Sequence, residues 1–439
     1  MKSNQNLLQG NIEKQLTMLA IPLFMGNIIQ QLYNIADSLI IGQFLGESAF
    51  AAVGVAGTIM NLAIFVISGA CTGAAILLAQ FYGERNFSSM KQESYIALIL
   101  GLALTLFLSG SGILFMPGIL TLLQTPADLK LPIQEYLTVI LGGLFTAFFY
   151  NFLASMLRAV GDTRAALLFL TISMGLNVIL DILFVGYLHF GIAGAAWATV
   201  LAQLFASFCS YLYLRKKYPQ LILKREDMHW EPQLAHKTIH FSSVTALQQS
   251  SIYIGKALVQ GAVNTMGTAA IAAYTASGRI ESIVNTIGSS GSDAISIFTA
   301  QNIGAGNKQR AKQGFHKGSV MVVSLGILLS AAMFLTSPWS VNLFLPDAGT
   351  DAITYGISYL KVVSVFYPFC FMGFAFVGFF RGNGNVRVPF VGSTFHIMVR
   401  AIFSYVLIDS MGLTGVALAT GLGWFLLMFY QTRSLKPYL

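Results

Sequence analysis

Long apolar stretches recur along nearly the whole chain and are separated by short polar segments. Twelve of them hold about twenty residues or more, the length that an α-helix needs to cross a hydrocarbon core about 30 Å thick. They run approximately over residues 16–41, 51–81, 95–115, 133–157, 165–188, 192–214, 239–262, 268–300, 318–335, 353–380, 388–408 and 413–430. The pattern predicts an all-α integral membrane protein with twelve transmembrane helices.

The charged residues between these stretches alternate in sign from one loop to the next. One set of loops and ends is basic: Lys2, Lys14, Arg85, Lys91, Arg158, Arg164, the cluster from Arg215 to Lys237, Lys308, Arg310, Lys312, Lys317, Arg381, Arg387, Arg433 and Lys436. The other set contains Lys130 as its one base, together with Glu47, Asp128, Asp347, Asp351 and Asp409. Because basic loops stay in the cytoplasm, this alternation predicts a multi-pass topology with both termini cytoplasmic.

Composition supports a membrane protein over a soluble enzyme. Hydrophobic residues make up 55% of the chain and charged residues 10%, and the mean hydropathy is +0.70. The net charge of +8 is carried by the short loops, so it does not indicate a nucleic-acid partner. Three separate cysteines inside apolar runs predict neither a disulfide framework nor a metal site.

The chain repeats itself about halfway along, on either side of a polar segment. Residues in the first half recur 221 or 223 positions later in the second half. The matching pairs include Gly46 and Gly267, Gln80 and Gln301, Asn86 and Asn307, Arg158 and Arg381, Gly161 and Gly384, Gly191 and Gly412, and Thr199 and Thr420. We predict two pseudo-symmetric six-helix lobes around a central cavity, over residues 1–214 and 238–439, joined by a cytoplasmic linker at 215–237. Such a duplication is typical of secondary transporters.

A polar stripe runs along the first apolar segment. Asn27, Gln30, Asn34 and Asp37 recur at helical spacing and therefore share one face of a helix that is otherwise compatible with lipid. An ionised side chain at membrane depth costs about 2.5–3.5 kcal/mol on insertion scales, so this face must meet a cavity or other helices. Asp37 is therefore a candidate functional residue.

Two further segments bring oxygen-bearing side chains to the depth of Asp37. Asp181 and Thr199 each lie about 9–12 Å below the same predicted surface, at a helical rise of 1.5 Å per residue. Asn177 stands four residues before Asp181 and shares its helix face. Two carboxylates, an amide and a hydroxyl suit a shared proton or a hard cation such as Na⁺. The alternative is that the two acids only join helices by hydrogen bonds.

The second half carries its own intramembrane charges, at Lys256, Arg279, Glu281 and Asp293. Lys256 stands near the repeat position of Asp37, and a buried ammonium requires a carboxylate or loses its proton. Three arrangements are open: Lys256 pairs with Glu281 or Asp293, Arg279 pairs with Glu281, or Lys256 extends outward to the membrane surface.

Taken together, the motifs resemble the multidrug and toxic compound extrusion (MATE) family. The resemblance is carried by Tyr33-Asn34-x-x-Asp37, Ala79-Gln80-x-x-Gly83, Arg158-Ala159-x-Gly161-Asp162, Asn177-x-x-x-Asp181 and Gly191-x-x-Gly194 with Thr199. It covers both halves and is nearest to the prokaryotic, DNA-damage-inducible type. In that branch a cation site lies in the first lobe, which maps here onto Asp37, Asn177, Asp181 and Thr199. Another branch keeps acids on the seventh and tenth helices, where this chain has Lys256 and Lys361 instead.

The resemblance implies an antiporter that exports cationic or amphipathic drugs in exchange for H⁺ or Na⁺ by alternating access. We therefore expect no enzymatic activity, no cofactor beyond the coupling ion, and a monomer in the bacterial plasma (inner) membrane. The alternative function is a lipid-linked oligosaccharide flippase of the same superfamily, whose cavity would concentrate Arg and Lys. Candidate residues of a drug-binding cavity are Gln30, Tyr33, Asn34, Met60, Phe149 and Tyr367.

Overall fold

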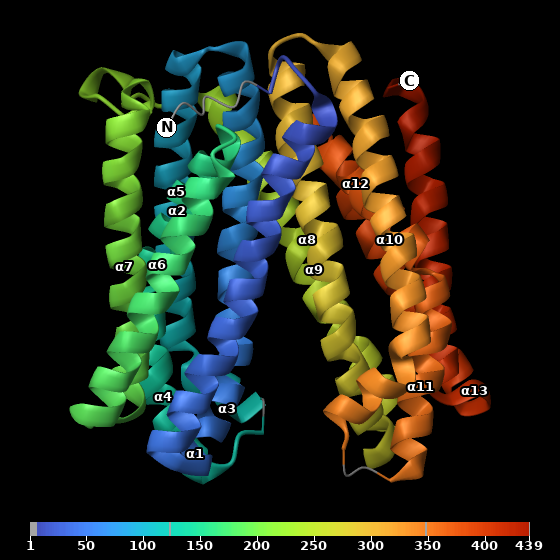
Figure 1. Ribbon diagram of the computed structural model, residues 1–439. Coiled ribbons are helices and arrows are strands. Elements are labelled where there is room, and N and C mark those ends of the chain that lie inside the picture. Colours follow the sequence, from blue (N-terminus) through green and yellow to red (C-terminus); the bar gives the residue numbers. More distant parts are fainter. Residues whose placement is uncertain (1–6, 123, 347–348, 439) are drawn as a thin grey trace. The chain divides into compact units, whose positions relative to one another are not determined.

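The computed structural model describes residues 7–122, 124–346 and 349–438, and all regular structure within these ranges is helical (Figure 1). Lys2 and Asp347, which were assigned to loops from the sequence, lie outside the described residues. The α-helices are α1 (Ile12–Glu84), α2 (Phe87–Leu114), α3 (Met116–Leu122), α4 (Ala127–Gly142), α5 (Leu144–Ala159), α6 (Thr163–Asp181), α7 (Gly191–Lys217), α8 (Pro232–Asn264), α9 (Thr268–Gly304), α10 (Lys308–Phe344), α11 (Thr350–Val365), α12 (Tyr367–Gly382) and α13 (Arg387–Leu435). Short turns of π-helix (Ile182–Tyr187) and 3₁₀-helix (Pro219–Leu221, Arg225–Asp227 and Lys436–Tyr438) complete the described structure.

Each of the twelve predicted segments is helical, which confirms the predicted fold class. Within the described ranges, α1, α2, α6 with its π-helical turn, α7, α10 and α13 are individually long and apolar enough to span a membrane. Two bent pairs form broken spans, α4 with α5 at 47° and α11 with α12 at 53°. Helices α1 and α13 each contain two predicted segments, divided at Gly46 and Gly412. Helices α8 and α9 supply the last two and are not among these individually apolar spans.

The chain forms two compact units. The first unit is Met25–Ala246, and the second unit is Met1–Phe24 together with Leu247–Leu439. The start of α1 therefore belongs to the second unit, where Leu16 joins an apolar core with Ile295 and Phe298. The boundaries expected from the repeat, at 1–214, 215–237 and 238–439, stay a prediction.

The two halves share unusual backbone geometry at matching positions. Gly46 has φ 84° and ψ −176°, and Gly267 has φ 88° and ψ −178°, a conformation that is nearly restricted to glycine. Asn86 and Asn307 cap α2 and α10 in the same way, each accepting a hydrogen bond from the backbone N–H three residues later. The sequence repeat therefore corresponds to a repeat of local structure.

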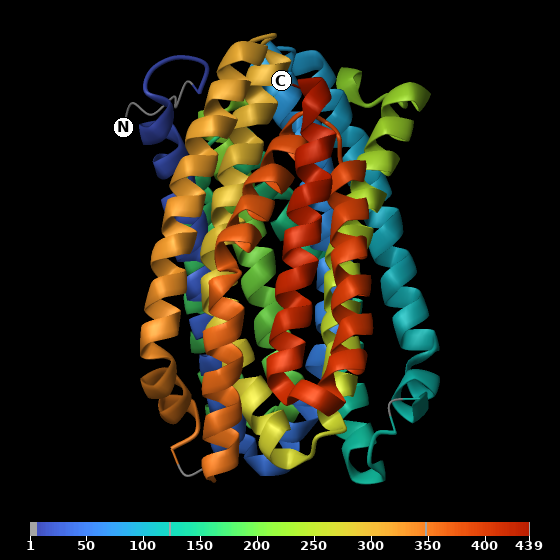
Figure 2. The same ribbon diagram turned by 90° about the vertical axis from the view of Figure 1, so that its right-hand side faces the viewer.

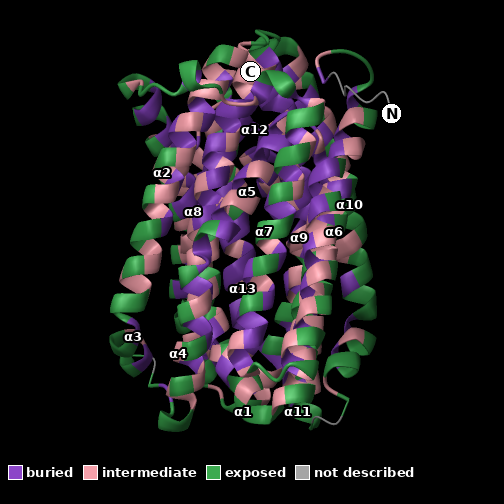
Figure 3. Ribbon diagram, turned by 90° about the vertical axis from the view of Figure 1, so that its left-hand side faces the viewer, coloured by how far each residue is buried: buried purple, intermediate pink, exposed green. Residues whose placement is uncertain are grey.

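Each unit packs a core beneath outer faces that remain apolar and exposed. Tyr359, Tyr367 and Phe371 are fully buried in the second unit, where α12 packs along α9 (Figure 2). In the first unit Ile41, Leu137 and Ala196 form a separate core. Exposed positions follow the outer helices, including α2 (Figure 3), as expected for helices that face lipid.

Within the first unit, polar contacts fasten the linker between α7 and α8, and the start of α8, onto α2. The Lys91 ammonium donates to the carboxylate of Asp227 at 2.9 Å. The Thr238 hydroxyl of α8 donates to Oε2 of the buried Glu93 at 2.7 Å. The linker therefore packs against α2 through charged and polar groups.

A second polar contact ties the end of α7 to the start of α6. Oδ2 of Asp162 accepts hydrogen bonds from Lys217 at 2.6 Å, from Tyr213 at 2.9 Å and from Tyr218 at 3.0 Å. Its other oxygen caps α6 by accepting from the backbone N–H of Ala165. Burial alone would raise the pKa of Asp162, but these three donors and the Lys217 charge together hold the pKa below its ordinary value.

Acidification should release this contact. The pKa of Asp162 is lower in the folded protein than in the unfolded chain. The contact therefore stabilises the folded protein fully at pH values above the ordinary carboxyl pKa of about 3.9. This stabilisation is lost as the pH falls through the folded pKa. We expect hydrogen exchange over residues 213–221, corrected for intrinsic rates, to be unchanged between pH 7 and 5 and to accelerate below pH about 3.9. Asp162→Asn should show the faster exchange at every pH. Acceleration already complete at pH 5 would contradict this assignment.

Candidate functional site

The first unit brings Asp37 of α1 and Asp181 of α6 together. Their side chains lie within hydrogen-bonding reach of each other, although 144 positions separate them in the chain. Asp181 is fully buried, and its Oδ1 atom has no hydrogen-bond partner among the described residues. Asp37 is half-buried. The two acids that the sequence placed at one depth therefore share one site.

Asn177 and Thr199 complete the predicted set. With its amide nitrogen facing Asp181, the orientation that satisfies both ends of the amide, Asn177 donates to Asp181 Oδ2 at 2.8 Å. Its carbonyl oxygen then accepts from the backbone N–H of Thr199 at 3.0 Å and from the Thr199 hydroxyl at 3.2 Å. This amide links α6 to α7 and fixes the orientation of the Asp181 carboxylate.

Two tyrosines border the acids. The Tyr33 hydroxyl, one helical turn before Asp37, lies 3.2 Å from the Asn177 nitrogen and in hydrogen-bonding reach of Thr199. Tyr136 of α4 is buried and close enough to Asp37 and Asp181 to interact with their charges. Tyr136 was missed in the sequence, where a single tyrosine in an apolar helix indicates only packing. Its repeat partner Tyr359, 223 positions later, is the signal that could have identified it.

The backbone next to Asp181 departs from regular α-helix. Helix α6 ends at Asp181, and the chain continues as the π-helical turn Ile182–Tyr187 before α7 begins at Gly191. Such wide turns are rare and often occur at functional sites, because they redirect side chains that a regular helix would stack. Here the turn places Asp181 where the helix changes its hydrogen-bonding pattern.

This arrangement, called here the acidic site, suits a small cation or a proton. Its inward groups are two carboxylates, an amide, a hydroxyl and two phenols, all of them hard oxygen or nitrogen groups. Two carboxylates in contact repel each other when both are ionised, so the pair favours a proton or a cation between them.

The second unit gathers a different group, called here the basic cluster: Lys256, Tyr274, Glu281, Tyr359, Tyr367 and Arg400. Arg400 of α13 donates to the Tyr274 hydroxyl at 3.0 Å, and Tyr367 donates to Glu281 Oε2 at 3.2 Å. Glu281 is buried and interacts electrostatically with Arg400. Lys256 of α8 is exposed and interacts electrostatically with both Arg400 and Glu281. Arg400 lies within the predicted helical segment 388–408 and was not among the residues predicted for a site.

The charge pairs considered for the second half do not form as expected. Among the described residues no ion pair joins Lys256 to Glu281 or Asp293, or Arg279 to Glu281. Asp293 instead lies 3.8 Å from Arg381, a buried base that also donates to Gln248 at 2.8 Å. Arg279 is exposed. The position of each residue along its helix predicted that these charges lie at similar depths. Which side chains come into contact depends also on how each helix is oriented about its own axis.

The candidate cavity residues divide between different surroundings. Gln30 and Asn34 are exposed on the face of α1 that carries Asp37. Met60 accepts a hydrogen bond from Tyr136 at 3.9 Å, and Phe149 packs against Phe148 at 5.6 Å between ring centroids. Tyr33 borders the acidic site, and Tyr367 belongs to the basic cluster. Their contact with a transported compound stays a prediction.

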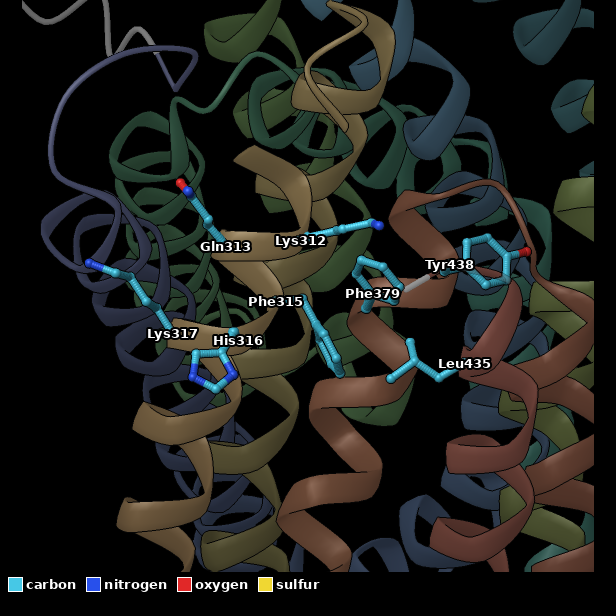
Figure 4. A pocket seen from close by; sticks show the side chains of 8 residues that line it. All are labelled: Lys312, Gln313, Phe315, His316, Lys317, Phe379, Leu435 and Tyr438. Carbon is cyan, nitrogen blue, oxygen red and sulfur yellow. The ribbon is translucent and has the colours of Figure 1, made fainter. Parts of the chain in front are cut away.

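A cavity of about 430 Å³ lies elsewhere in the second unit, between the start of α10 and the ends of α12 and α13 (Figure 4). It is lined by Lys312, Gln313, Phe315, His316, Lys317, Phe379, Leu435 and Tyr438. Phe315, Phe379 and Leu435 point into the hollow, whereas the Lys317 side chain points away from it. The lining includes no residue of the acidic site or of the basic cluster.

Comparison with known proteins identifies the family. The model of the MatE family matches residues 22–183 and, 223 positions later, residues 245–406. The chain belongs to the MATE family. Two matches of one family model also confirm that the halves are repeats. The assignment to the DNA-damage-inducible type stays a prediction.

Individual relatives cover most of this MATE protein. The probable multidrug resistance protein YpnP of Bacillus subtilis (strain 168) is 29% identical over 420 residues, covering 95% of this chain and 93% of the relative. A protein named FAD transporter from Shewanella oneidensis is 28% identical over 321 residues, covering 71% and 70%. A crystal structure of MATE in the bent conformation superposes with TM-score 0.92 at 22% identity, covering 100% of this chain and 98% of the other. The structural match shows the MATE fold, and the family makes this protein a transporter.

Proposed function

We propose that this MATE protein is a secondary active antiporter that exports cationic or amphipathic compounds in exchange for H⁺ or Na⁺. The observation that supports the proposal is the acidic site, where Asp37 and Asp181 lie in contact within one unit. Ionisable side chains at membrane depth are rare and typically mark ion or substrate pathways. The names of the relatives, which are multidrug resistance proteins, support drugs as the exported compounds.

Coupling follows if the ion and the exported compound stabilise different conformations. An ion bound between the two carboxylates removes their repulsion and favours the closed arrangement of α1, α6 and α7 around them. A compound that binds better to the open arrangement expels the ion. Exchange then requires only this difference in affinity between two states.

The expected orientation belongs to the same proposal. The connection between α9 and α10 lies at the same end of the second unit as the C-terminus, and the start of α11 lies at the opposite end (Figure 1). The first connection is followed by Lys308, Arg310 and Lys312, whereas the first turn of α11 contains the acidic Asp351. The positive-inside rule therefore supports cytoplasmic termini in a bacterial plasma membrane.

Proteoliposomes test the function. Purified protein is reconstituted into liposomes loaded with a fluorescent organic cation, and a pH gradient or a Na⁺ gradient is imposed separately. We expect one of the gradients to drive movement of the dye, and the dye in turn to dissipate that gradient. Dye movement that is equally fast without any ion gradient would contradict antiport.

A second candidate is export of a phosphate-bearing compound. The observation that favours it is the name of the Shewanella oneidensis relative, FAD transporter. A lipid-linked oligosaccharide flippase, the alternative considered from the sequence, would share that chemistry. Uptake of flavin adenine dinucleotide into the same liposomes distinguishes these compounds from cationic drugs.

A further inference from the structure

The basic cluster occupies the position in the second unit that the acidic site occupies in the first. Counting 223 positions along the repeat places Tyr136 on Tyr359, Asn177 on Arg400 and Asp181 on Ser404. The pairing is structural as well: Tyr136 borders the carboxylates of the first unit, and Tyr359 borders Arg400 and Glu281 in the second. The two units therefore contain equivalent sites with different charges.

The charge of the second site is reversed. The first unit presents two carboxylates, whereas the second presents Arg400 in place of the amide, the neutral Ser404 in place of Asp181, and Lys256 near the place of Asp37. The second unit also contains one acid that the first unit lacks at the equivalent position. Glu281 stands 221 positions after Met60 and is therefore its counterpart in the repeat. Two bases and one acid leave a positive charge in excess.

The hydrogen-bond donors of the cluster also exceed its acceptors. A guanidinium has five N–H donors, yet Nε of Arg400 is buried without a partner in the described structure. The Ser404 hydroxyl is buried and unpartnered as well. In the described part of the chain Glu281 forms no ion pair, and it accepts a hydrogen bond from Tyr367, so it does not satisfy these unpartnered donors. Lys256 is exposed and has no ion-pair partner among the described residues.

We propose that the basic cluster binds an anionic group, a carboxylate or a phosphate, on the compound that this protein transports. The inference rests on the proposed transport function and narrows its substrate class to amphipathic compounds that carry a negative group beside an apolar body. Arg400 supplies a planar pair of donors, which matches the two oxygens of a carboxylate. Lys256 supplies a charge on the exposed side of the cluster, and Glu281 accepts a hydrogen bond from Tyr367.

Two dyes that differ only in this group test the proposal. Rhodamine 110 carries a free carboxylate, and rhodamine 123 is its methyl ester and a plain cation. Binding of each dye to the purified full-length protein is measured at equilibrium by fluorescence polarisation, without any ion gradient. The variants are Arg400→Gln, Lys256→Gln and Glu281→Gln. Lys361→Gln is the matched control, because it removes a base of α11 that lies over Phe334 outside the cluster.

We expect the wild type to bind rhodamine 110 about tenfold or more tightly than rhodamine 123, the size of one charge-assisted hydrogen bond. Arg400→Gln and Lys256→Gln should lose this preference while keeping their affinity for rhodamine 123. Glu281→Gln should increase the preference, since it removes the competing negative charge. Lys361→Gln should behave as the wild type.

Three results would overturn the proposal. Failure of the wild type to prefer the carboxylate dye is one, and a preference that survives both Arg400→Gln and Lys256→Gln is another. The third is an equal loss of affinity for both dyes in these variants, which would mean that the bases only support the fold. If Arg400→Gln fails to fold, the dye preference of the Lys256→Gln variant still tests the proposal, because Lys256 is exposed. Because no gradient is used, the dye preference stands or falls independently of ion coupling.

Discussion

Asp37→Asn is expected to reduce gradient-driven efflux to the rate of protein-free liposomes. The amide keeps the size and shape of the side chain but replaces one acceptor oxygen with an NH₂ donor, and it neither releases a proton nor neutralises a cation. The ion can then no longer favour one conformation over the other, and the difference in affinity that drives exchange disappears. Efflux of a fluorescent cation from proteoliposomes measures the effect under each gradient separately.

The control for this variant is Asp409→Asn, which removes an exposed acid of α13. It should transport like the wild type and should reach the membrane in the same amount as Asp37→Asn. Normal efflux by Asp37→Asn would remove the acidic site from the mechanism. A variant that is absent from the membrane would be replaced by Asp37→Glu, for which we expect slowed but measurable exchange.

Among glycine-to-alanine substitutions in the second unit, each of which adds a single carbon atom, Gly378→Ala is expected to cause the largest loss of stability. Gly378 and Gly382 lie four residues apart on α12, a spacing of small residues that lets two membrane helices approach closely. A Cβ atom at Gly378 would lie 2.3 Å from the backbone oxygen of Ser292 on α9. Because that neighbour is backbone, α9 and α12 must separate, which costs about 1–3 kcal/mol.

Thermal unfolding followed by fluorescence-detected size exclusion measures this effect. The unfolding temperature should fall by about 2–4 °C for each kcal/mol lost, the scale for a unit of this size. Gly278→Ala on α9 is the matched control, since no atom lies within 4 Å of its added Cβ. We expect that control to be neutral or slightly stabilising. Equal unfolding temperatures for the two variants would contradict the close packing of α9 on α12.

The twelve helices could be predicted from the sequence because each apolar run is long enough to span the bilayer and each boundary is polar. The breaks inside two spans could not. Helix α4 gives way to α5 at Gly143, and α11 gives way to α12 at Phe366, without a polar residue to mark either point. The bends leave no trace in the hydrophobic pattern. Their local signals are Gly142-Gly143 at the first break and Pro368 just after the second, residue types at which helices bend or begin.

The acidic site could be predicted because depth alone determined it. Asp37, Asp181 and Thr199 lie at one level on the first, fifth and sixth predicted helices, and the structure brings those helices together. The second unit required more than depth. Lys256 and Glu281 also lie at similar levels, yet the hydrogen bond to Glu281 of α9 comes from Tyr367 of α12, three helices further along the chain. Which face each helix turns inward depends on tertiary packing.

The central claim is that Asp37 and Asp181 bind one ion jointly, and infrared difference spectroscopy tests it most directly. Spectra of the reconstituted protein are recorded on acidification and on addition of Na⁺, for the wild type, Asp37→Asn and Asp181→Asn. The account predicts a carboxyl band in the wild type that changes with one of the two ions and disappears in both variants. A band that disappears in one variant and persists unchanged in the other would show two independent acids and would contradict the account.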